Sequence, residues 1–338
     1  GDVYKRQGDY LGTTVRTEGR PAATVIGELV PKILADLTWA KSMRWGDGDG
    51  PWVRPVHGLV VLFEGEIVDG ELFGVAAGDT TIGHPIHSAK PFAVKSATDY
   101  CRKMSRRGID IRFDDRRATL VAGMTEAASR AGGALVDDPE LIDKLTAICG
   151  IPGVVVGEFD ARYLELPREV LTASLRDHKS ALTVESKGEL LPCFLTVMDR
   201  LEDPEGRVRA GNEWVVAARL DDARFFYGED RKRTLKQRRV DLEHLVFHAR
   251  LGSYADKTER IVQLTAARCE VLDWGEDRAA AVEAADLLKV DLTTEMVKEF
   301  TSLQGIVGGV YARQDGLDEP VWMAIYDQYT PAAIDDPI

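Results

Sequence analysis

The stretch from Gly211 to Ile261 constrains the fold of this chain more than any other, because it lies in the longest part of the sequence without proline. Its apolar residues keep the spacing of a helix for most of its length. They form two stripes: Val215, Leu220, Phe226 and Tyr227, and then Phe247, Leu251, Tyr254, Thr258 and Ile261. We therefore expect a helical region that begins near Asn212 and continues to the end of the chain.

The densest positive charge of the chain lies between these two stripes, and we call residues 231–239 the basic segment. Six of its nine residues are basic: Arg231, Lys232, Arg233, Lys236, Arg238 and Arg239. At 100° per residue, six cations cannot share one helix face, so most of the segment is expected to face water. Lys232, Lys236 and Arg239 follow each other at steps of four and three and are predicted to form one ridge.

Two interpretations of the basic segment remain open on charge alone. It can be a solvated helix face that Glu229, Asp230 and Asp241 neutralise, or a ridge that contacts phosphate groups. Charge runs are most often solvated faces, so the composition of the segment favours the first interpretation.

Length and composition describe an ordinary globular protein. A chain of 338 residues is long enough for two domains, and its 44% hydrophobic and 29% charged residues supply a core and a polar surface. The net charge of −13 argues against non-specific coating of nucleic acid. It leaves room for RNA binding at a local basic patch, because phosphate contacts depend on the local field.

The cellular compartment is also indicated by the sequence. No apolar run has the length of a membrane span, and no signal peptide opens the chain. The four cysteines, Cys101, Cys149, Cys193 and Cys269, are widely separated and predict reduced thiols in place of disulfides or a zinc site. We therefore predict a cytoplasmic protein with no membrane partner.

The order of strand, turn and helix signals along the sequence predicts three regions. Residues 1–44 contain a patternless leader, Gly1–Gln7, and a helical lead-in. Residues 45–205 interleave strands, such as a buried strand at Leu59–Phe63, with helices of unequal length, which indicates an α+β domain. Residues 206–338 are predicted to be helical.

Two features of the first half resemble metal sites. The loop Asp47–Gly50 has alternating aspartates, but it lacks the twelve-residue spacing of an EF-hand and is predicted to be a turn. His84 and His87 are three residues apart, but no third ligand follows and Pro85 lies between them. We interpret His84 and His87 as loop or strand histidines and predict no metal site in either feature.

Several longer segments carry a resemblance to a known family. They read ARLDDARFFYGEDRK from Ala218 to Lys232, ELPREVL from Glu165 to Leu171, LLPCFLTV from Leu190 to Val197 and LKVDLTTEMV from Leu288 to Val297. Together they resemble the β subunit of bacterial glycyl-tRNA synthetase, from Tyr10 to Pro331. The resemblance lacks the beginning of the usual subunit and its C-terminal half with the anticodon-binding domain, so we expect a fragment.

The resemblance implies a fold. It implies a mixed α/β, B3/B4-like N-terminal domain followed by an all-helical, degenerate HD-like domain. A working HD phosphohydrolase, the alternative enzyme, needs a His-Asp pair and further histidines for its metal. Here Val290 precedes Asp291 and no histidine follows His248, so we expect a scaffold without metal.

The resemblance also implies a function and partners. These are an α subunit, in an α2β2 heterotetramer, and tRNA(Gly). ATP and Mg²⁺ would be used by the α subunit, and no catalytic residue or cofactor is expected in this chain, whose sequence contains no ATP-binding motif. A stand-alone RNA-binding scaffold is an alternative that the sequence does not separate from this function.

With the resemblance, the second interpretation of the basic segment becomes the favoured one. All six of its cations, Arg231, Lys232, Arg233, Lys236, Arg238 and Arg239, become candidate tRNA contacts, since phosphate contacts position RNA without reading its sequence. A weaker candidate is the cluster Arg102, Lys103, Arg106 and Arg107, which lies near a predicted helix end and can instead complement the helix dipole.

Overall fold

The computed structural model describes residues 18–331, except residues 48 and 276. The chain divides into two compact units after Ile111, and each unit is described by itself. This division falls inside the predicted α+β region, residues 45–205. The mixture of helices and small sheets confirms the α+β class. The predicted leader, Gly1–Gln7, lies outside the described residues.

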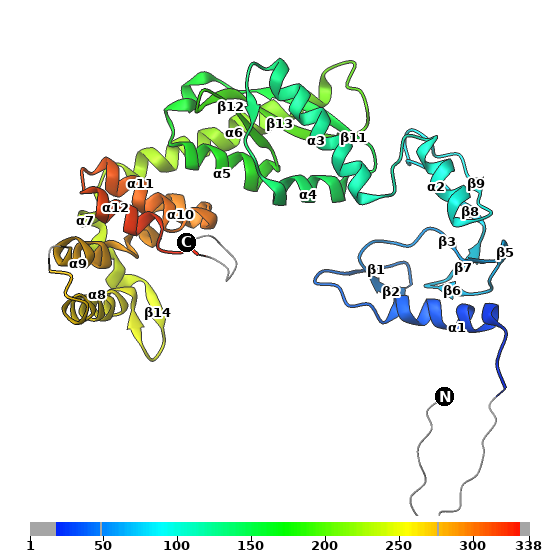
Figure 1. Ribbon diagram of the computed structural model, residues 1–338, viewed down its shortest axis with the longest axis horizontal. Helices are drawn as coiled ribbons and strands as arrows, with labels where there is room; N and C mark the ends of the chain where they lie inside the picture. The colour runs from blue at the N-terminus through cyan, green and yellow to red at the C-terminus, as the bar shows by residue number, and fades with distance from the viewer. Residues whose placement is uncertain (1–17, 48, 276, 332–338) are drawn as a thin grey trace, which may run out of the picture. The chain divides into compact units, whose positions relative to one another are not determined.

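The first unit consists of short strands between two helices (Figure 1). Its elements are α1 (Ala22–Ala35), β1 (Met43–Trp45), β2 (Asp49–Trp52), β3 (Leu59–Val60), β4 (Leu62–Phe63), β5 (Glu66–Ile67), β6 (Glu71–Leu72), β7 (Val75–Gly78), β8 (Thr80–Thr81), β9 (Phe92–Ala93) and α2 (Ala97–Ser105). The strands form four two-stranded antiparallel pairs, and β3 adds to one of them in parallel, in the order β3-β7-β6.

The prediction of one buried strand at Leu59–Phe63 is wrong. The segment is divided between β3 and β4, and none of its residues is buried. The two halves pair with different partners, β7 and β5. Five apolar residues in a row predicted burial, but a unit made of two-residue strands has too few layers to cover them.

The second unit begins with a four-stranded antiparallel sheet in the order β10-β12-β13-β11. Its elements are α3 (Phe113–Arg130), β10 (Ala134–Leu135), α4 (Pro139–Ile148), β11 (Pro152–Glu158), η1 (Ala161–Glu165), α5 (Arg168–Lys179), β12 (Leu182–Ser186) and β13 (Glu189–Asp199). Lys187 and Gly188 both have positive φ and form the turn that joins β12 to β13 in a hairpin. Glycine is favoured there because it carries no Cβ.

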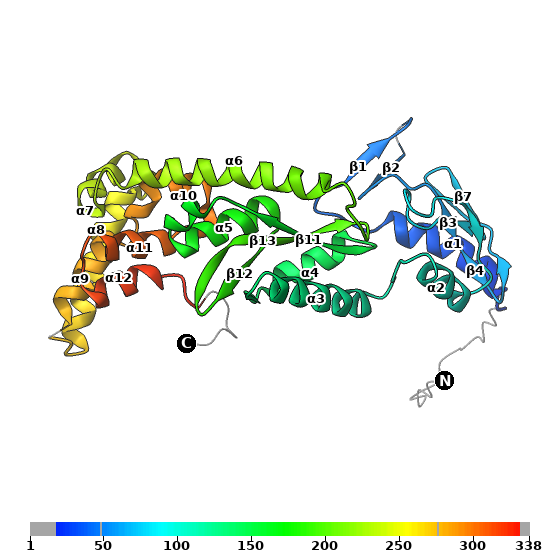
Figure 2. The ribbon, with the colours of Figure 1, turned by 90° about the horizontal axis from the view of Figure 1, so that it is seen from above.

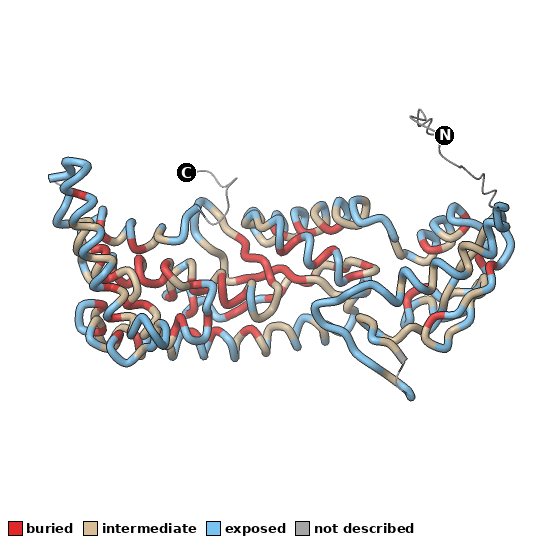
Figure 3. Tube along the Cα trace, turned by 90° about the horizontal axis from the view of Figure 1, so that it is seen from below, coloured by how far each residue is buried: buried red, intermediate tan, exposed pale blue. Residues whose placement is uncertain are grey.

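Helices cover both faces of this sheet, as the alternation along β13 requires. Cys193 and Leu195 point into a core with α3 and α4, whereas Phe194 points to the opposite face, toward α5 and α6. Gly157 of β11 packs against the ring of Phe194, where a Cβ would approach the ring to 2.2 Å. The buried trace of the sheet is red in Figure 3.

Helix α6 (Arg207–Asp230) joins this sheet to the helical core (Figure 2). Val216 and Leu220 pack under the sheet, and Ala223, further along, belongs to the core of the helical part. Leu166 and Val170 of the preceding segment belong to that helical core too. The predicted boundary between residues 205 and 206 therefore does not separate two cores in the structure.

The helical part fills the rest of the chain. It consists of α7 (Leu235–Arg238), η2 (Arg239–His244), β14 (Val246–His248), β15 (Gly252–Ser253), α8 (Tyr254–Val271), α9 (Arg278–Leu287), η3 (Val290–Thr293), α10 (Glu295–Glu299), η4 (Thr301–Leu303), α11 (Ile306–Gln314) and α12 (Glu319–Tyr326). The prediction that it is all helical is wrong at β14 and β15, which pair as a hairpin beside α8 (Figure 1). Gly252, at φ +87°, lets the chain turn back before α8 begins.

A second helix break lies in the basic segment. Helix α6 ends at Asp230, and a capping box between Thr234 and Gln237 starts α7 afresh. Lys232, Lys236 and Arg239 thus belong to a turn, to α7 and to η2. The predicted single ridge is wrong, because it required one continuous helix.

Within residues 18–331, apart from residues 48 and 276, no helix has both the length and the apolar character of a membrane span.

Candidate functional site

Every cation of the basic segment is in an ion pair with a carboxylate. The pairs are Arg231–Asp315, Lys232–Glu229, Arg233–Asp241, Lys236–Glu283, Arg238–Asp230 and Arg239–Asp286. Three of the six partners, Asp315, Glu283 and Asp286, lie outside the three acids that were expected to neutralise the segment. The segment is therefore a network that links α6, α7 and η2 to α9 and the end of α11.

Arg238 and Asp230 form the buried centre of this network. The Asp230 side chain is completely buried, and that of Arg238 is 9% exposed. Asp230 also accepts hydrogen bonds from the backbone N–H groups of Glu295 and Met296, at 2.9 and 3.0 Å, and from the hydroxyl of Tyr311. Its carboxylate thus holds the first turn of α10. Arg238, predicted to contact tRNA, is positioned to hold the helical core together.

Arg231 and Arg233 are also held by carboxylates at the protein surface. Arg231 donates to Asp315 at 2.7 Å, and the same carboxylate accepts the backbone N–H of Leu235 at 2.8 Å. Arg233 donates to Asp241 and lowers the pKa of that carboxyl. Both arginines therefore fix the turn between α6 and α7.

Lys232 and Lys236 are the two cations of the segment that reach furthest into solvent. Their side chains are 65% and 60% exposed, and each is paired with one glutamate, Glu229 or Glu283. Exposed pairs of this kind contribute about 0–1 kcal/mol. These two lysines can therefore exchange a glutamate for another anion at little cost.

A second group of cations lies beside the β14–β15 hairpin, and we call Lys257, Arg260 and Lys289 the α8 cluster. None of the three is in an ion pair with a carboxylate of the described residues. Lys257 and Arg260 are three residues apart on α8, so their side chains leave the helix as neighbours. Burial, followed by the charges of Lys289 and Arg260, lowers the pKa of Lys257.

The two ammonium groups of the α8 cluster rest on neutral groups. The Nζ of Lys257 lies 4.0 Å from the ring centroid of Phe247 and 5.6 Å from that of Tyr254. The Nζ of Lys289 donates to the side-chain oxygen of Gln328 at 2.6 Å and to the hydroxyl of Tyr329 at 2.7 Å. Both charges are held in place without being cancelled.

Asp291 occupies the position where an HD motif has its aspartate. It is buried, with Val290 in the apolar core beside it, and burial raises the pKa of Asp291 to about 6. One carboxylate oxygen accepts the backbone N–H of Gly305, and the other has no hydrogen-bond partner. In the described part of the chain, no three His, Cys, Asp or Glu side chains gather as they would around a metal ion.

The other sequence candidates lie in the first unit. His84 is buried and stacks on His87 at 4.7 Å between ring centroids, and its Nδ1 accepts backbone N–H groups of Ile86 and His87. This nitrogen is engaged in the loop that was predicted for these histidines. In the loop Asp47–Gly50, residue 48 lies outside the described residues.

The weaker basic cluster on α2 is partly neutralised. Arg102 and Lys103 both pair with Asp99 and hold the pKa of that carboxyl well below its usual range. Arg107 donates to the carbonyl of Lys103 and stacks over the ring of Phe92. Arg106 is exposed. Most of this positive charge thus serves the helix and its neighbouring strand.

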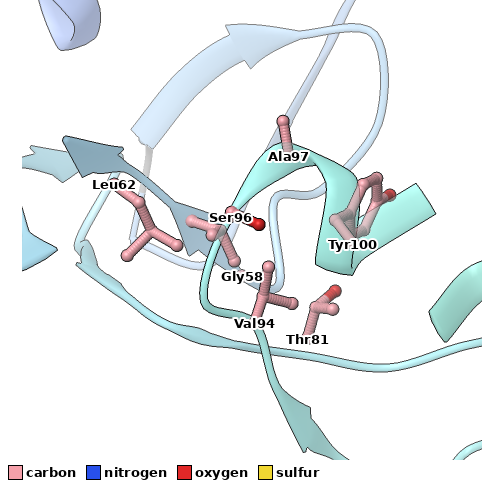
Figure 4. A pocket seen from close by; sticks show the side chains of 8 residues that line it. Gly58, Leu62, Thr81, Val94, Ser96, Ala97 and Tyr100 are labelled. Atoms are coloured by element: carbon pink, nitrogen blue, oxygen red, sulfur yellow. The ribbon is translucent and has the colours of Figure 1, made fainter. Parts of the chain in front are cut away.

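A cavity of about 440 Å³ also lies in the first unit, next to the start of α2 (Figure 4). Its lining is Gly58, Val60, Leu62, Thr81, Val94, Ser96, Ala97 and Tyr100. The hydroxyl of Ser96 already accepts the N–H of Asp99. The lining contains no carboxylate, imidazole, thiol or amine, so it offers no acid–base pair of that kind.

Comparison with known proteins decides the family. The family model of the glycyl-tRNA synthetase β subunit matches residues 2–338. The chain belongs to this family. The match begins before Tyr10 and ends after Pro331, so it is longer at both ends than the resemblance expected from the sequence.

Individual relatives agree with the family match. The chain is 39% identical over 334 residues to the glycine–tRNA ligase β subunit of Nitratidesulfovibrio vulgaris, which covers 98% of this chain and 48% of the relative. It is 38% identical to the β subunits of Oleidesulfovibrio alaskensis, over 98% of this chain and 48% of the relative, and of Acidobacterium capsulatum, over 99% and 49%. The chain therefore spans about half the length of the curated relatives it matches.

Proposed function

We propose that this chain acts as part of the β subunit of a glycine–tRNA ligase. It binds tRNA(Gly) and supports an α subunit, in an α2β2 heterotetramer, that joins glycine to the tRNA. The observation that carries the proposal is the family match over residues 2–338, together with relatives near 38% identity. The protein works in the cytoplasm, which agrees with four cysteines that are all free thiols.

The α subunit supplies the chemistry in this proposal. ATP and Mg²⁺ act there, and the β chain contributes binding energy and orientation without bond-making groups. The buried Arg238–Asp230 ion pair supports a scaffolding role, because it links α6 to α7 while the same carboxylate accepts N–H groups of α10. A phosphohydrolase is not favoured, since Val290 stands where its histidine is needed.

The tRNA contact involves the basic segment through its two most exposed cations. Lys232 and Lys236 exchange their surface glutamates for RNA phosphates, while Arg231, Arg233, Arg238 and Arg239 keep the segment folded. Contacts of this kind position RNA and do not read its sequence.

Reconstitution with an α subunit tests the proposal. The chain is mixed with a glycine–tRNA ligase α subunit, and glycine-dependent charging of tRNA(Gly) is measured together with co-elution of the two proteins. We expect a stable complex, and more charging than with the α subunit alone. A chain that neither co-elutes with the α subunit nor binds tRNA(Gly) would contradict it.

A further inference from the structure

The α8 cluster differs from the basic segment, because its charges are held in place but are not neutralised by a carboxylate. Lys257 is held over the rings of Phe247 and Tyr254, and Lys289 is held by a glutamine and a tyrosine. Cation–π contacts and neutral acceptors fix the position of an ammonium group and leave its positive charge available.

The nearest acidic groups are already engaged. Asp256 lies one turn before Arg260 on α8, but its carboxylate accepts the N–H and the hydroxyl of Ser253 and caps the helix. Asp291 raises the pKa of Lys289, but burial lowers that pKa by more. The carboxylates therefore weaken the positive field of the α8 cluster without removing it.

We propose that Lys257, Arg260 and Lys289 form a binding site for the phosphate backbone of RNA. This inference rests on the proposed function, which supplies tRNA(Gly) as the polyanion. The partly buried position of Lys257 and Lys289 carries a desolvation cost, and a bound phosphate offsets it by restoring an anionic neighbour.

RNA fits this site better than an acidic protein segment does. The protein has a net charge of −13, so a polyanion binds where positive charge is concentrated and not neutralised. Aromatic rings flank the cations, and Tyr329 is 44% exposed. Cationic grooves lined by aromatic rings are the usual arrangement for unpaired RNA, because every base has a face that can stack.

The test compares two variants of the full chain that lose the same formal charge. K257Q/R260Q removes two cations of the α8 cluster, and K232Q/K236Q removes two paired cations of the basic segment. Binding of a tRNA(Gly) transcript is followed by anisotropy over a series of salt concentrations. For K257Q/R260Q we expect binding about 25- to 60-fold weaker at about 0.1 M salt and a salt slope smaller by about 1.4–1.8. For K232Q/K236Q we expect tRNA binding to be weaker by about threefold or less.

Two further measurements separate the site from loss of fold. K257R/R260K keeps both charges and is expected to retain most of the affinity. On the wild-type chain, bound tRNA should protect Lys257 and Lys289 from an amine-reactive reagent, while Lys187, in the β12–β13 turn, should stay reactive.

The outcomes distinguish this inference from the proposed function. Equal binding by the two double variants, with no protection of Lys257 and Lys289, would overturn the inference and leave the proposed function standing. If K257Q/R260Q lost binding to the α subunit but kept its tRNA binding, the site would belong to a protein partner and the inference would be overturned too. A wild-type chain that does not bind tRNA would overturn both.

Discussion

The basic segment and the α8 cluster show that the partners of the cations, more than the number of cations, determine how much positive charge a surface presents. The basic segment has six cations in nine residues, and every one of them is in an ion pair. The α8 cluster has two cations on one helix and a third, Lys289, further along the chain, and none of them is paired with a described carboxylate. The basic segment therefore stabilises the fold, whereas the α8 cluster keeps its positive charge available to a ligand.

Removing Asp230 is expected to have the largest effect on this comparison. D230A leaves Arg238 buried without its partner and leaves two N–H groups in the first turn of α10 without their acceptor. We therefore expect the free energy of unfolding to fall by about 3–5 kcal/mol. Urea denaturation measures it. The matched control is D222A on the same helix, where the exposed pair with Arg219 contributes at most about 1 kcal/mol. Similar losses in both variants would show that the buried pair has no special role.

Replacing Asp291 tests the acid nearest to Lys289. Burial raises its folded pKa to about 6, above the ordinary 3.8, so the folded state binds the proton more tightly than the unfolded state. That contribution to stability is present below about pH 4 and lost as pH rises through about 6. The stability of D291N relative to the wild type should thus increase by up to about 3 kcal/mol between pH 4 and pH 7.

Urea titrations at several pH values measure this difference, and a difference that does not change with pH would contradict it. At neutral pH, D291N should also bind tRNA more tightly, because it removes the negative charge that weakens the field of Lys289.

Removing acids can make the basic segment resemble the α8 cluster. E283Q/D286N takes away the partners of Lys236 and Arg239. We expect about two- to fivefold tighter tRNA binding and at most about 1 kcal/mol of lost stability per pair, because both pairs are partly exposed to solvent. Anisotropy and urea denaturation give both values, with E126Q, next to Arg130 on α3, as the control. Unchanged affinity would mean that RNA does not approach the segment.

The smallest effect is expected from the exposed lysines. K232Q/K236Q should weaken tRNA binding by about threefold or less, since each lysine must give up a glutamate before it contacts a phosphate. Its unfolding midpoint should match that of the wild type. A loss as large as that of K257Q/R260Q would reverse the order of the two regions.

Local signals predicted the parts of the fold that depend on neighbours in sequence. Asp138 before Pro139 is a local signal for the start of α4, and the Asp138 side chain accepts the N–H of Leu141. Gly188 is a local signal for the β12–β13 turn, where it has a positive φ. Two further signals of this kind are the pairs Thr234 with Gln237 and Ser253 with Asp256, each a capping box that starts a new helix.

Contacts between distant residues could not be predicted in this way. Arg231 and Asp315 are 84 positions apart, and nothing in the local sequence connects them. Asp256 and Arg260 have the spacing of a helical ion pair, yet Asp256 caps its own helix. The family was found from the sequence because long segments match it, whereas the charge state of each cation depends on tertiary neighbours.

Helix α6 gives the second unit a mechanical property. At 24 residues it is about 36 Å long, and its two ends belong to different hydrophobic cores. Such a rod cannot bend much without breaking its own hydrogen bonds, so a displacement at the helical end tilts the sheet end as well. A displacement beside α10 is therefore transmitted along the helix to β13. We expect the two cores to unfold together in one cooperative transition.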